Sequence, residues 1–314
     1  MPADRWDVHD IPDQAGRTVL VTGPSVGGLG HHTALELARR GARVVLAGRS
    51  PAKVGETAAA LREEVPAAEV VELQLDLADL TSVRRAAAEA ATLGPLHVLV
   101  NNAGVMGTPP GRTVDGLDLQ LGTNHYGPFL LTGLLWPQLV AAGSQGEAAR
   151  VVAVSSTMHR IARSAPLRDP RSTEGRYRKW QVYGQSKLAN LLFTHELERR
   201  SVAAGTPVRA MAAHPGFAGT HLAANGQYGR ARGGRATILD ATIRAVSQSA
   251  AAGAWPTLMA ATADLPGGTY VGPGGPGEMA GPPRVTTGTR LSRDEDAARR
   301  LWELSEEVTG VRFP

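Results

Sequence analysis

The feature that most constrains the fold of this chain is an alternation between short apolar runs and amphipathic helical patterns. β-branched or apolar runs predict strands at residues 18–22, 43–47, 70–75, 96–100, 151–154 and 208–213. Helical patterns separate them at residues 29–40, 51–65, 116–140 and 177–203, with one more that ends near residue 91 and is capped by Asp79 or Thr81. Strands that alternate with helices form βαβ crossovers, so the pattern predicts an α/β fold with a doubly wound parallel sheet.

The rest of the chain is consistent with one folded unit. It has 314 residues, of which 42% are hydrophobic, and this is enough for a sizeable core. An arginine-bearing insertion at 157–176 and a Gly-, Ala- and Arg-rich segment at 217–245 interrupt the alternation, and we expect the second to form a lid. A Gly/Pro stretch at 266–283 and an amphipathic helix at 293–308 follow. No boundary would let this tail fold alone, so residues 1–314 are predicted to form a single domain.

Composition excludes several classes of function. The chain has no cysteine, which excludes disulfides, thiolate zinc sites and a cysteine nucleophile, and which suits a reducing cytoplasm. Residues 1–16 are a polar N-terminal extension without the apolar core of a signal peptide or membrane anchor, so a cytoplasmic protein is expected. Aromatic residues are only 4% of the chain, and no DNA-reading motif accompanies the net charge of +4, so no nucleic-acid partner is expected. The adjacent His31 and His32 point to different helix faces, so no metal site is predicted.

A glycine cluster, TGPSVGGLG at residues 22–30, joins the first strand to the first helix. Glycines let the backbone turn tightly and approach a pyrophosphate, whose charge is met by free N–H groups and the dipole at the helix start. Such a cluster alone could be an ordinary turn, but its place between a strand and a helix favours dinucleotide binding on a Rossmann-like sheet. The residues predicted to hold the pyrophosphate are Gly23, Ser25, Gly28, Leu29 and Gly30.

The position after the second strand indicates which nucleotide is preferred. A fold built for NAD usually places an acidic residue there to hold the ribose hydroxyls. This chain has no acidic residue between Glu36 and Glu56 and offers Arg49 instead. A guanidinium suits a 2′-phosphate, although Arg49 could also be a solvent-facing loop residue. The combination favours NADP(H) over NAD(H).

Tyr183 and Lys187 are four residues apart in a predicted helix and therefore share one face. An ammonium group near a phenol favours the phenolate and lowers its pKa toward the range useful for general acid/base catalysis. As a bare pattern Tyr-x-x-x-Lys is common and is usually an exposed pair. In this chain the motifs around the pair favour a catalytic role.

Further motifs occur in a fixed order over nearly the whole chain. They are the 22–30 glycine turn, Asp76-Leu77, Asn101-Asn102-Ala103-Gly104, Asn124, Ser155-Ser156, Tyr183-Gly-Gln-Ser-Lys187, and Pro215-Gly216 leading to Thr220. In these pieces the chain resembles the short-chain dehydrogenase/reductase family. The strings NNAGVM, TNHYGPFLLTGLL, YGQSKLANLLFTHEL and RRLWELSEEVTGVRFP are similar to the retinol dehydrogenase and WW-domain oxidoreductase subgroup.

The resemblance implies a role for each matched residue. Tyr183 would exchange the proton with the substrate oxygen, and Lys187 would bind the nicotinamide ribose and lower the pKa of Tyr183. Ser156 would hydrogen-bond the substrate oxygen, and Asn124 would hold a helix bend and a water linked to Lys187. The implied cofactor contacts are Asp76 and Leu77 at the adenine, Asn102, Ala103 and Gly104 after the fourth strand, Tyr183 and Lys187, and Pro215, Gly216 and Thr220, the last at the nicotinamide amide.

The chain departs from the family pattern in its spacing. Four residues rather than three separate Gly23 from Gly28, so either Gly27 or Gly28 is the second glycine of the motif. The gap between Ser156 and Tyr183 is longer than the family minimum, as in the retinol dehydrogenase subgroup. Members of that subgroup often carry an apolar N-terminal anchor, which this N-terminal extension does not resemble.

Together these features predict an NADP(H)-dependent oxidoreductase that moves a hydride between nicotinamide and the carbonyl or alcohol carbon of an apolar small molecule. One alternative is a non-catalytic NADP(H)-binding regulator on the same fold, which would not need to keep Asn124, Ser156, Tyr183 and Lys187. An isomerase or dehydratase of the extended class is disfavoured by the glycine spacing and the sequence around Tyr183. Substrate identity, reaction direction and homo-oligomerisation stay open.

Overall fold

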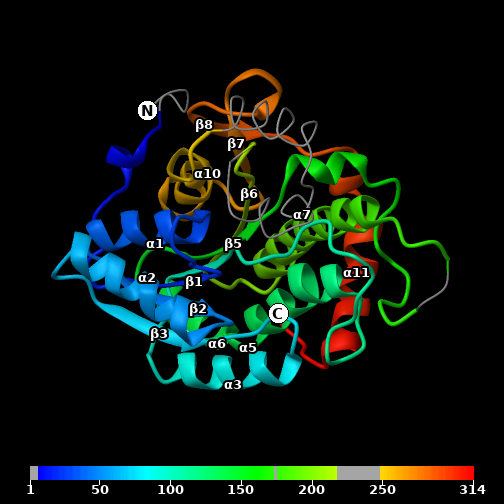
Figure 1. The fold of residues 1–314 in the computed structure, drawn as a ribbon, viewed down its shortest axis with the longest axis horizontal. Helices are drawn as coiled ribbons and strands as arrows, with labels where there is room; N and C mark the ends of the chain where they lie inside the picture. Colours follow the sequence, from blue (N-terminus) through cyan, green and yellow to red (C-terminus); the bar gives the residue numbers. More distant parts are fainter. Residues whose placement is uncertain (1–5, 173–174, 218–247) are drawn as a thin grey trace, which may run out of the picture.

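An eight-stranded sheet forms the centre of the computed structural model, which describes residues 6–172, 175–217 and 248–314 (Figure 1). The strand order is β3-β2-β1-β4-β5-β6-β7-β8. Neighbours from β3 to β7 pair in parallel, and β8 runs antiparallel to β7. The strands are β1 (Thr18–Thr22), β2 (Arg43–Gly48), β3 (Val70–Gln74), β4 (Val98–Asn101), β5 (Ala149–Val154), β6 (Val208–Ala213), β7 (Tyr270–Pro273) and β8 (Pro283–Thr286). The sheet confirms the predicted doubly wound α/β fold, and its order reverses between β1 and β4, where such folds bind ligands.

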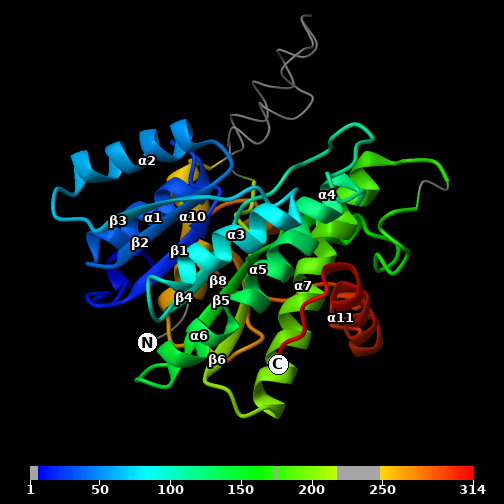
Figure 2. The ribbon, with the colours of Figure 1, turned by 90° about the horizontal axis from the view of Figure 1, so that it is seen from below.

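Helices cover both faces of the sheet (Figures 1 and 2). On one face lie α1 (Leu29–Arg39), α2 (Pro51–Glu64) and α10 (Ala250–Thr262). On the other lie α3 (Leu80–Ala91), α5 (Gly127–Leu134), α6 (Trp136–Gly143) and α7 (Lys179–Ala203), with α11 (Glu295–Thr309) packed against α7. Short 3-10 turns complete the described structure at η2 (Val8–Asp10), η4 (Thr157–Ile161), η6 (Pro276–Glu278) and η7 (Leu291–Arg293). None of the helices in the described ranges is both long and apolar enough to cross a membrane.

The apolar core is divided by the sheet into two clusters. Along β1, Leu20 faces the cluster beneath α3, α5 and α7, whereas Val19 and Val21 face the cluster beneath α1 and α10. Side chains alternate between the two faces of a strand, so a central strand buried on both faces needs apolar residues throughout. The N-terminal extension joins the second cluster through Trp6 and Ile11. Because the central strands are buried on both faces, their sequences are apolar throughout, and the strand pattern in the sequence is strong.

The predicted helix at 116–140 is wrong as a single element. The structure divides this region into α4 (Leu119–Leu121), the π-helix η3 (Gly122–Tyr126), α5 and α6, with a break at Leu135. Pro137 lies in the first turn of α6, after the break, where a missing N–H costs little. Pro128 lies in the first turn of α5, which continues directly from η3, so its missing N–H removes a backbone bond at the end of the π-helix. The apolar pattern was continuous because α5 is buried nearly all round.

The C-terminal third contains elements that the sequence did not predict. Strands β7 and β8 have four residues each; β7 lies within the Gly/Pro stretch and β8 begins at its last residue, where the usual strand pattern is weak. Helix α10 contains Pro256 and is apolar over most of its surface, so it shows no amphipathic period. The helix predicted at 293–308 is present as α11, and Asp294 caps it. The segment proposed as a lid, 217–245, lies outside the described residues except for Phe217.

Candidate active site

The carboxyl ends of the parallel strands bring the predicted site residues to one edge of the sheet. The turns that leave these ends begin at Gly23 after β1, Asn102 after β4, Ser155 and Ser156 after β5 and His214 after β6. Helix α7 packs against β5 and β6 and brings Tyr183 and Lys187 to the same edge. Residues from five separate parts of the chain therefore converge at the position where doubly wound sheets bind their ligands.

Tyr183 lies within hydrogen-bonding reach of Ser156. The tyrosine is 4% exposed, and burial raises the pKa of its phenol to about 12, while the hydrogen bond to Ser156 opposes that rise. Ser156 is the N-cap of η4, and its Oγ accepts a hydrogen bond of 3.2 Å from the backbone N–H of Met158. The Ser156 hydroxyl therefore serves both as the cap of η4 and as the partner of Tyr183.

Lys187 lies one helical turn beyond Tyr183 and is 4% exposed. Its Nζ donates a 3.0 Å hydrogen bond to the carbonyl of Val154 and lies 5.9 Å from the centroid of the Tyr183 ring. Burial lowers the pKa of Lys187 to about 8. The lowering of the Tyr183 pKa that we expected from Lys187 is not found in the protein alone, because burial of the phenol dominates and the ammonium is directed at a carbonyl.

Asn124 sits in the middle of the π-helix η3 and is almost fully buried. Its side chain bonds both backbone groups of Val105, accepting from N–H at 2.7 Å and donating to C=O at 2.9 Å, and also donates to Ser186 Oγ. A Cβ added to Gly104 would lie 3.0 Å from Asn124 Oδ1 and 3.5 Å from Lys187 Nζ. Asn124, Gly104 and Lys187 therefore pack against one another, and Asn124 lies in a π-helical distortion of the helix; its predicted role in holding a bend and a water stays a prediction.

The glycine turn after β1 has the form that a pyrophosphate site requires. Gly23 and Gly27 have left-handed backbones, with φ of 67° and 74°, and Gly28 is the N-cap of α1. No side chain caps α1, so its first N–H groups are available to an anion. A Cβ at Gly30 would lie 2.5 Å from the carbonyl oxygen of Gly23. The turn is thus a close-packed cradle that fits the diphosphate of a dinucleotide, and both Gly27 and Gly28 are part of it.

Asn102 and Ala103 support this turn from the end of β4. The Asn102 side chain donates to the carbonyls of Thr22 at 2.8 Å and Gly23 at 3.1 Å, and the backbone N–H groups of both residues donate to Thr22 Oγ1. A Cβ at Gly23 would lie 2.9 Å from Ala103. Asn102 and Ala103, which follow β4, therefore hold the glycine turn in its shape.

The residues predicted near the adenosine half lie beside β2 and β3. Arg49 directly follows β2, is exposed, and makes no hydrogen bond or ion pair with another described residue. Asp76 is partly buried and accepts a hydrogen bond from the N–H of Ala78. Leu77 is 5% exposed, and its side chain belongs to the core cluster with Phe129. The Leu77 side chain is therefore already occupied by packing.

The segment predicted at the nicotinamide follows β6. Gly216 has a φ of 65°, and an added Cβ would overlap the carbonyl oxygen of Met279, so only glycine fits there. The His214 ring accepts a 3.2 Å hydrogen bond from the Gly216 N–H through Nδ1. Thr220 lies outside the described residues. Pro215 and Gly216 are thus packed against a loop that the sequence did not connect with the site.

Two buried polar residues at this edge were missed from the sequence. Gln120 is fully buried and joins the N–H of Gly107, the hydroxyl of Tyr177 and the carbonyl of Lys179. Its signal was an amide inside an apolar helical pattern, which indicates a buried hydrogen-bonding role. Glu278 contacts His214, in the segment after β6. No motif around Glu278 in the sequence indicates a functional role.

Comparison with known proteins identifies the family. The model of the short chain dehydrogenase family matches residues 17–165. The chain is 38% identical over 307 residues to polyprenol dehydrogenase of Mus musculus, which covers 96% of this chain and 86% of that protein. It is 37% identical over 300 residues to human retinol dehydrogenase 12, with 95% and 88% coverage. The chain therefore belongs to the short-chain dehydrogenase family and resembles its retinol dehydrogenase members.

Solved structures give the same result. An uncharacterised protein from Mycobacterium paratuberculosis has 42% identity and a TM-score of 0.76, with 98% of this chain and 99% of that chain covered. A protein described as an NAD(P)-dependent gluconate 5-dehydrogenase from Beutenbergia cavernae, with NADP bound, has 26% identity and a TM-score of 0.60, with 79% and 90% covered. The protein is accordingly an oxidoreductase that acts on CH–OH or C=O groups, in a family that uses NAD(P).

Proposed function

We propose that this protein is an NADP(H)-dependent oxidoreductase in which Tyr183 exchanges a proton with the oxygen of a carbonyl or alcohol substrate. The observation that carries the proposal is the juxtaposition of the Tyr183 phenol, the Ser156 hydroxyl and Lys187 at the sheet edge that also holds the uncapped glycine turn. When bound, the nicotinamide supplies or accepts the hydride. The protein then needs to orient the substrate, stabilise charge on its oxygen and move one proton.

The pKa values suit a division of these tasks. A pKa of about 12 keeps the Tyr183 phenol protonated at neutral pH, which is the form that donates a proton during reduction. A pKa of about 8 leaves Lys187 mostly cationic at neutral pH, and its charge favours the phenolate that remains after the transfer. Ser156 can donate its hydroxyl proton to the same substrate oxygen. Asn124 holds the backbone of Val105 and Gly104 beside Lys187.

The preference for NADP(H) rests on Arg49. This guanidinium is exposed, follows β2, and has no partner among the described residues, so it is free to bind a 2′-phosphate. No acidic side chain stands at this position to hold the ribose hydroxyls of NAD. The protein described as an NAD(P)-dependent gluconate 5-dehydrogenase from Beutenbergia cavernae has NADP bound, so a similar fold accommodates the 2′-phosphate.

An apolar substrate is proposed from the surface next to the site. Ile161 follows the Ser156 turn, Phe217 follows Gly216, and Met279 packs on Gly216; their side chains are about two-fifths exposed. Contiguous exposed apolar patches mark binding surfaces, and the Phe217 N–H bonds the Met279 carbonyl, which places these two residues side by side at Gly216. The relatives named polyprenol dehydrogenase and retinol dehydrogenase act, by their names, on apolar alcohols.

Consumption of NADPH with a panel of aldehydes and ketones, including long apolar ones, tests the activity. Tyr183→Phe is expected to lower turnover by about 10²–10⁴-fold and to weaken NADPH binding far less, because it removes the proton donor and only one hydroxyl among many cofactor contacts. Tyr126→Phe is the matched control, since that buried hydroxyl has no hydrogen-bond partner among the described residues and its loss should leave turnover unchanged. Tight NADPH binding with no turnover of any carbonyl would favour the regulator instead.

The cofactor preference is tested separately by binding measurements with NADPH and NADH. Arg49→Ala is expected to weaken NADPH about tenfold, which corresponds to ~1.4 kcal/mol, and to leave NADH affinity unchanged. NADH is the internal control because it lacks the phosphate that Arg49 would bind. If the variant binds NADPH as tightly as the wild type, Arg49 does not cause the preference.

A further inference from the structure

The carboxylate of Glu278 joins three segments that are far apart in the sequence. Its Oε2 lies 2.9 Å from Arg160 Nη2 and 3.0 Å from His214 Nε2, and its Oε1 accepts a 2.6 Å hydrogen bond from Thr286. Arg160 belongs to η4, His214 follows β6 and Thr286 ends β8. The Glu278 side chain is only 13% exposed. The carboxylate thus has charged or polar partners on all three sides in a largely dry environment.

The backbone of Glu278 is strained. Among the described residues it is the only non-glycine residue with a positive φ, at 57°. A left-handed backbone costs a residue with a side chain roughly 1–2 kcal/mol, and such strain persists where surrounding contacts determine the conformation. The neighbouring residue, Gly277, is also left-handed. A second glycine at position 278 would adopt the same conformation without strain. A glutamate at this position indicates that its side chain contributes more than the strain costs.

His214 connects Glu278 with the segment predicted at the nicotinamide. Its ring is completely buried and lies in a slot on β7 that exists because residue 272 is glycine, since an added Cβ there would overlap Nε2. Nδ1 accepts a hydrogen bond from the N–H of Gly216, so in the neutral ring the proton is on Nε2, which faces the carboxylate. The His214 contact, followed by Thr286 and Arg160, holds the pKa of Glu278 at about 2 against the opposing effect of burial. The carboxylate is therefore charged at every working pH.

The backbone next to Glu278 also contacts this segment. The carbonyl of Met279 accepts a 2.8 Å hydrogen bond from the N–H of Phe217. The same carbonyl packs so tightly on Gly216 that a side chain there would overlap it. The η6 loop therefore supports both sides of Gly216, through the His214 ring and through its own backbone.

Arg160 connects Glu278 with the turn that carries Ser156. Arg160 lies in η4, which begins at the Ser156 N-cap and is closed by the bond from the Met158 N–H to Ser156 Oγ. His159, next to Arg160, contacts the Ser156 carbonyl through its ring Nδ1 at 2.7 Å. One carboxylate thus links the serine side of the site to the Gly216 side.

We propose that Glu278 is a positioning residue that fixes the distance between the Gly216 segment and the Ser156 turn. This role rests on the proposed function, in which the nicotinamide lies against Gly216 and the substrate oxygen against Ser156. Hydride transfer depends steeply on the separation and alignment of the two reacting carbons, and a displacement of about 1 Å can lower the rate about 10²-fold. Glu278 touches neither reactant and acts through His214 and Arg160.

Two substitutions separate the side chain from the backbone. Glu278→Gly removes the carboxylate but relieves the left-handed strain, so the loop can keep its path. Glu278→Gln keeps the length of the side chain and the bond from Thr286 but loses the charge. Glu147→Gln is the matched control, because Glu147 pairs with Arg17 at the opposite edge of the sheet and is 76% exposed.

The first measurement compares binding of NADPH with binding of 2′-phospho-ADP-ribose, which lacks the nicotinamide ring. In Glu278→Gly the affinity for NADPH is expected to fall about three- to tenfold, whereas the affinity for the fragment stays the same. The second measurement is the deuterium isotope effect with NADPH labelled at the transferred position. The kcat of Glu278→Gly is expected to fall about 10- to 100-fold, with a larger isotope effect because hydride transfer becomes slower than product release. Glu278→Gln should lie between Glu278→Gly and the wild type in both measurements.

The outcomes distinguish this inference from the proposed function. If the wild type turns over carbonyls and Glu278→Gly keeps its kcat, isotope effect and affinity ratio, the positioning role is wrong and the activity stands. A purely structural role would lower the melting temperature and the number of binding sites, with unchanged kcat per site, and would also overturn the inference. If the wild type turns over no carbonyl, the proposed function fails, and the affinity ratio alone decides whether Glu278 positions Gly216.

Discussion

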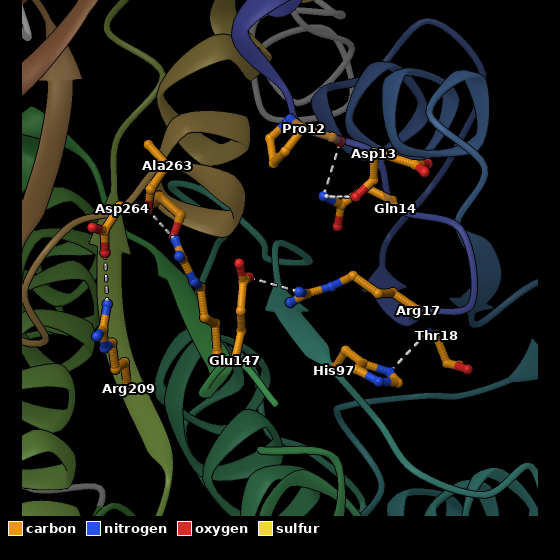
Figure 3. Close-up of polar contacts among 12 residues, drawn as sticks. Pro12, Asp13, Gln14, Arg17, Thr18, His97, Glu147, Arg209, Ala263 and Asp264 are labelled. Atoms are coloured by element: carbon orange, nitrogen blue, oxygen red, sulfur yellow. Dashed lines mark hydrogen bonds and ion pairs between the residues drawn. The ribbon is translucent and has the colours of Figure 1, made fainter. Parts of the chain in front are cut away.

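Two ion pairs at the amino edge of the sheet each include a carboxylate that faces water (Figure 3), whereas the catalytic candidates at the carboxyl edge are buried. Figure 3 shows Arg17 paired with Glu147 and Arg209 paired with Asp264, and the two carboxylates are 76% and 98% exposed. At the carboxyl edge, Tyr183 and Lys187 are each 4% exposed and have strongly shifted pKa values. Breaking an exposed ion pair changes the free energy of unfolding little. A buried group with a shifted pKa lowers the stability of the protein but is more reactive.

Hydrogen bonds at both edges join segments that are far apart in the sequence. At the amino edge Arg17 bonds Glu147, and Arg150 donates to the carbonyls of Ala260 and Ala263. At the carboxyl edge Asn124 and Glu278 also join separate segments, and here the bonds reach the residues proposed for the site. A change at the carboxyl edge should therefore move parts of the site, whereas a change at the amino edge should leave the site in place.

The largest difference is expected between two buried amides, Asn124 and Gln14, which are 1% and 2% exposed. Asn124→Ala leaves the N–H and C=O of Val105 without their partners and should lower the free energy of unfolding by ~3 kcal/mol. Because Gly104 and Lys187 pack on this side chain, turnover should also fall at least about tenfold. Gln14→Ala should cost ~1 kcal/mol and leave turnover unchanged. Urea unfolding and steady-state kinetics on both variants make the test, and equal losses of turnover would contradict the comparison.

An intermediate difference is expected between two buried cations, Lys187 and Arg150. The folded pKa of Lys187 is about 8, below the ordinary value of 10.5. Between these values the unfolded chain binds more protons, so this lysine makes the protein more stable as pH rises. From pH 7 to pH 9 the wild type should therefore gain ~1 kcal/mol relative to Lys187→Met.

Arg150 provides the matched case at the amino edge. It donates to the carbonyls of Ala260 and Ala263 at the end of α10, and burial lowers its pKa to about 10. Arg150→Met should cost ~2 kcal/mol through the lost hydrogen bonds. That cost should be nearly the same at pH 7 and pH 8, because the guanidinium is charged in both the folded and the unfolded states there. Urea unfolding between pH 7 and pH 9 measures both comparisons. If the stability difference between the wild type and Lys187→Met stays constant over this range, Lys187 does not titrate there.

The smallest effect is expected for the exposed pair between Arg209 and Asp264. Asp264→Asn should change the melting temperature by less than about 1 °C, at low and at high salt, because water screens the pair. Thermal unfolding followed by circular dichroism measures this. A loss of stability as large as that of Asn124→Ala would show that the amino edge is as sensitive to substitution as the carboxyl edge.

The sequence predicted the part of the fold in which local patterns and burial agree. Strands β1, β2, β4 and β5 were found because each is mostly apolar and buried on both faces, and β3 and β6 were found from shorter apolar runs. Their order placed the motif residues at one edge. The helix at 116–140 was predicted as continuous because hydrophobic period does not report a switch from i→i+4 to i→i+5 hydrogen bonds. Strands β7 and β8 were missed because each has only four residues and contains glycine or proline, which weaken the strand pattern.

The candidate site shows the same limit. Gly23, Asn124, Ser156 and Tyr183 were identified because each belongs to a motif that is continuous in the sequence. Glu278 was not identified, since its partners Arg160, His214 and Thr286 meet it only in three dimensions. The upward pKa shift of Tyr183 was also missed, because desolvation depends on packing that the spacing of Tyr183 and Lys187 does not reveal.

The π-helix η3 has a consequence for how chain length relates to this site. A π-turn accommodates one residue more than an α-turn over the same rise, so η3 is equivalent to a single-residue insertion in an otherwise regular helix. Removing one residue upstream of Asn124 within η3 would restore the α-helix and rotate Asn124 by about 100° about its axis. The helix would survive and the carboxamide would point away from Val105. An asparagine at this position is therefore not sufficient. The number of residues in the π-turn decides whether its carboxamide reaches the backbone of Val105.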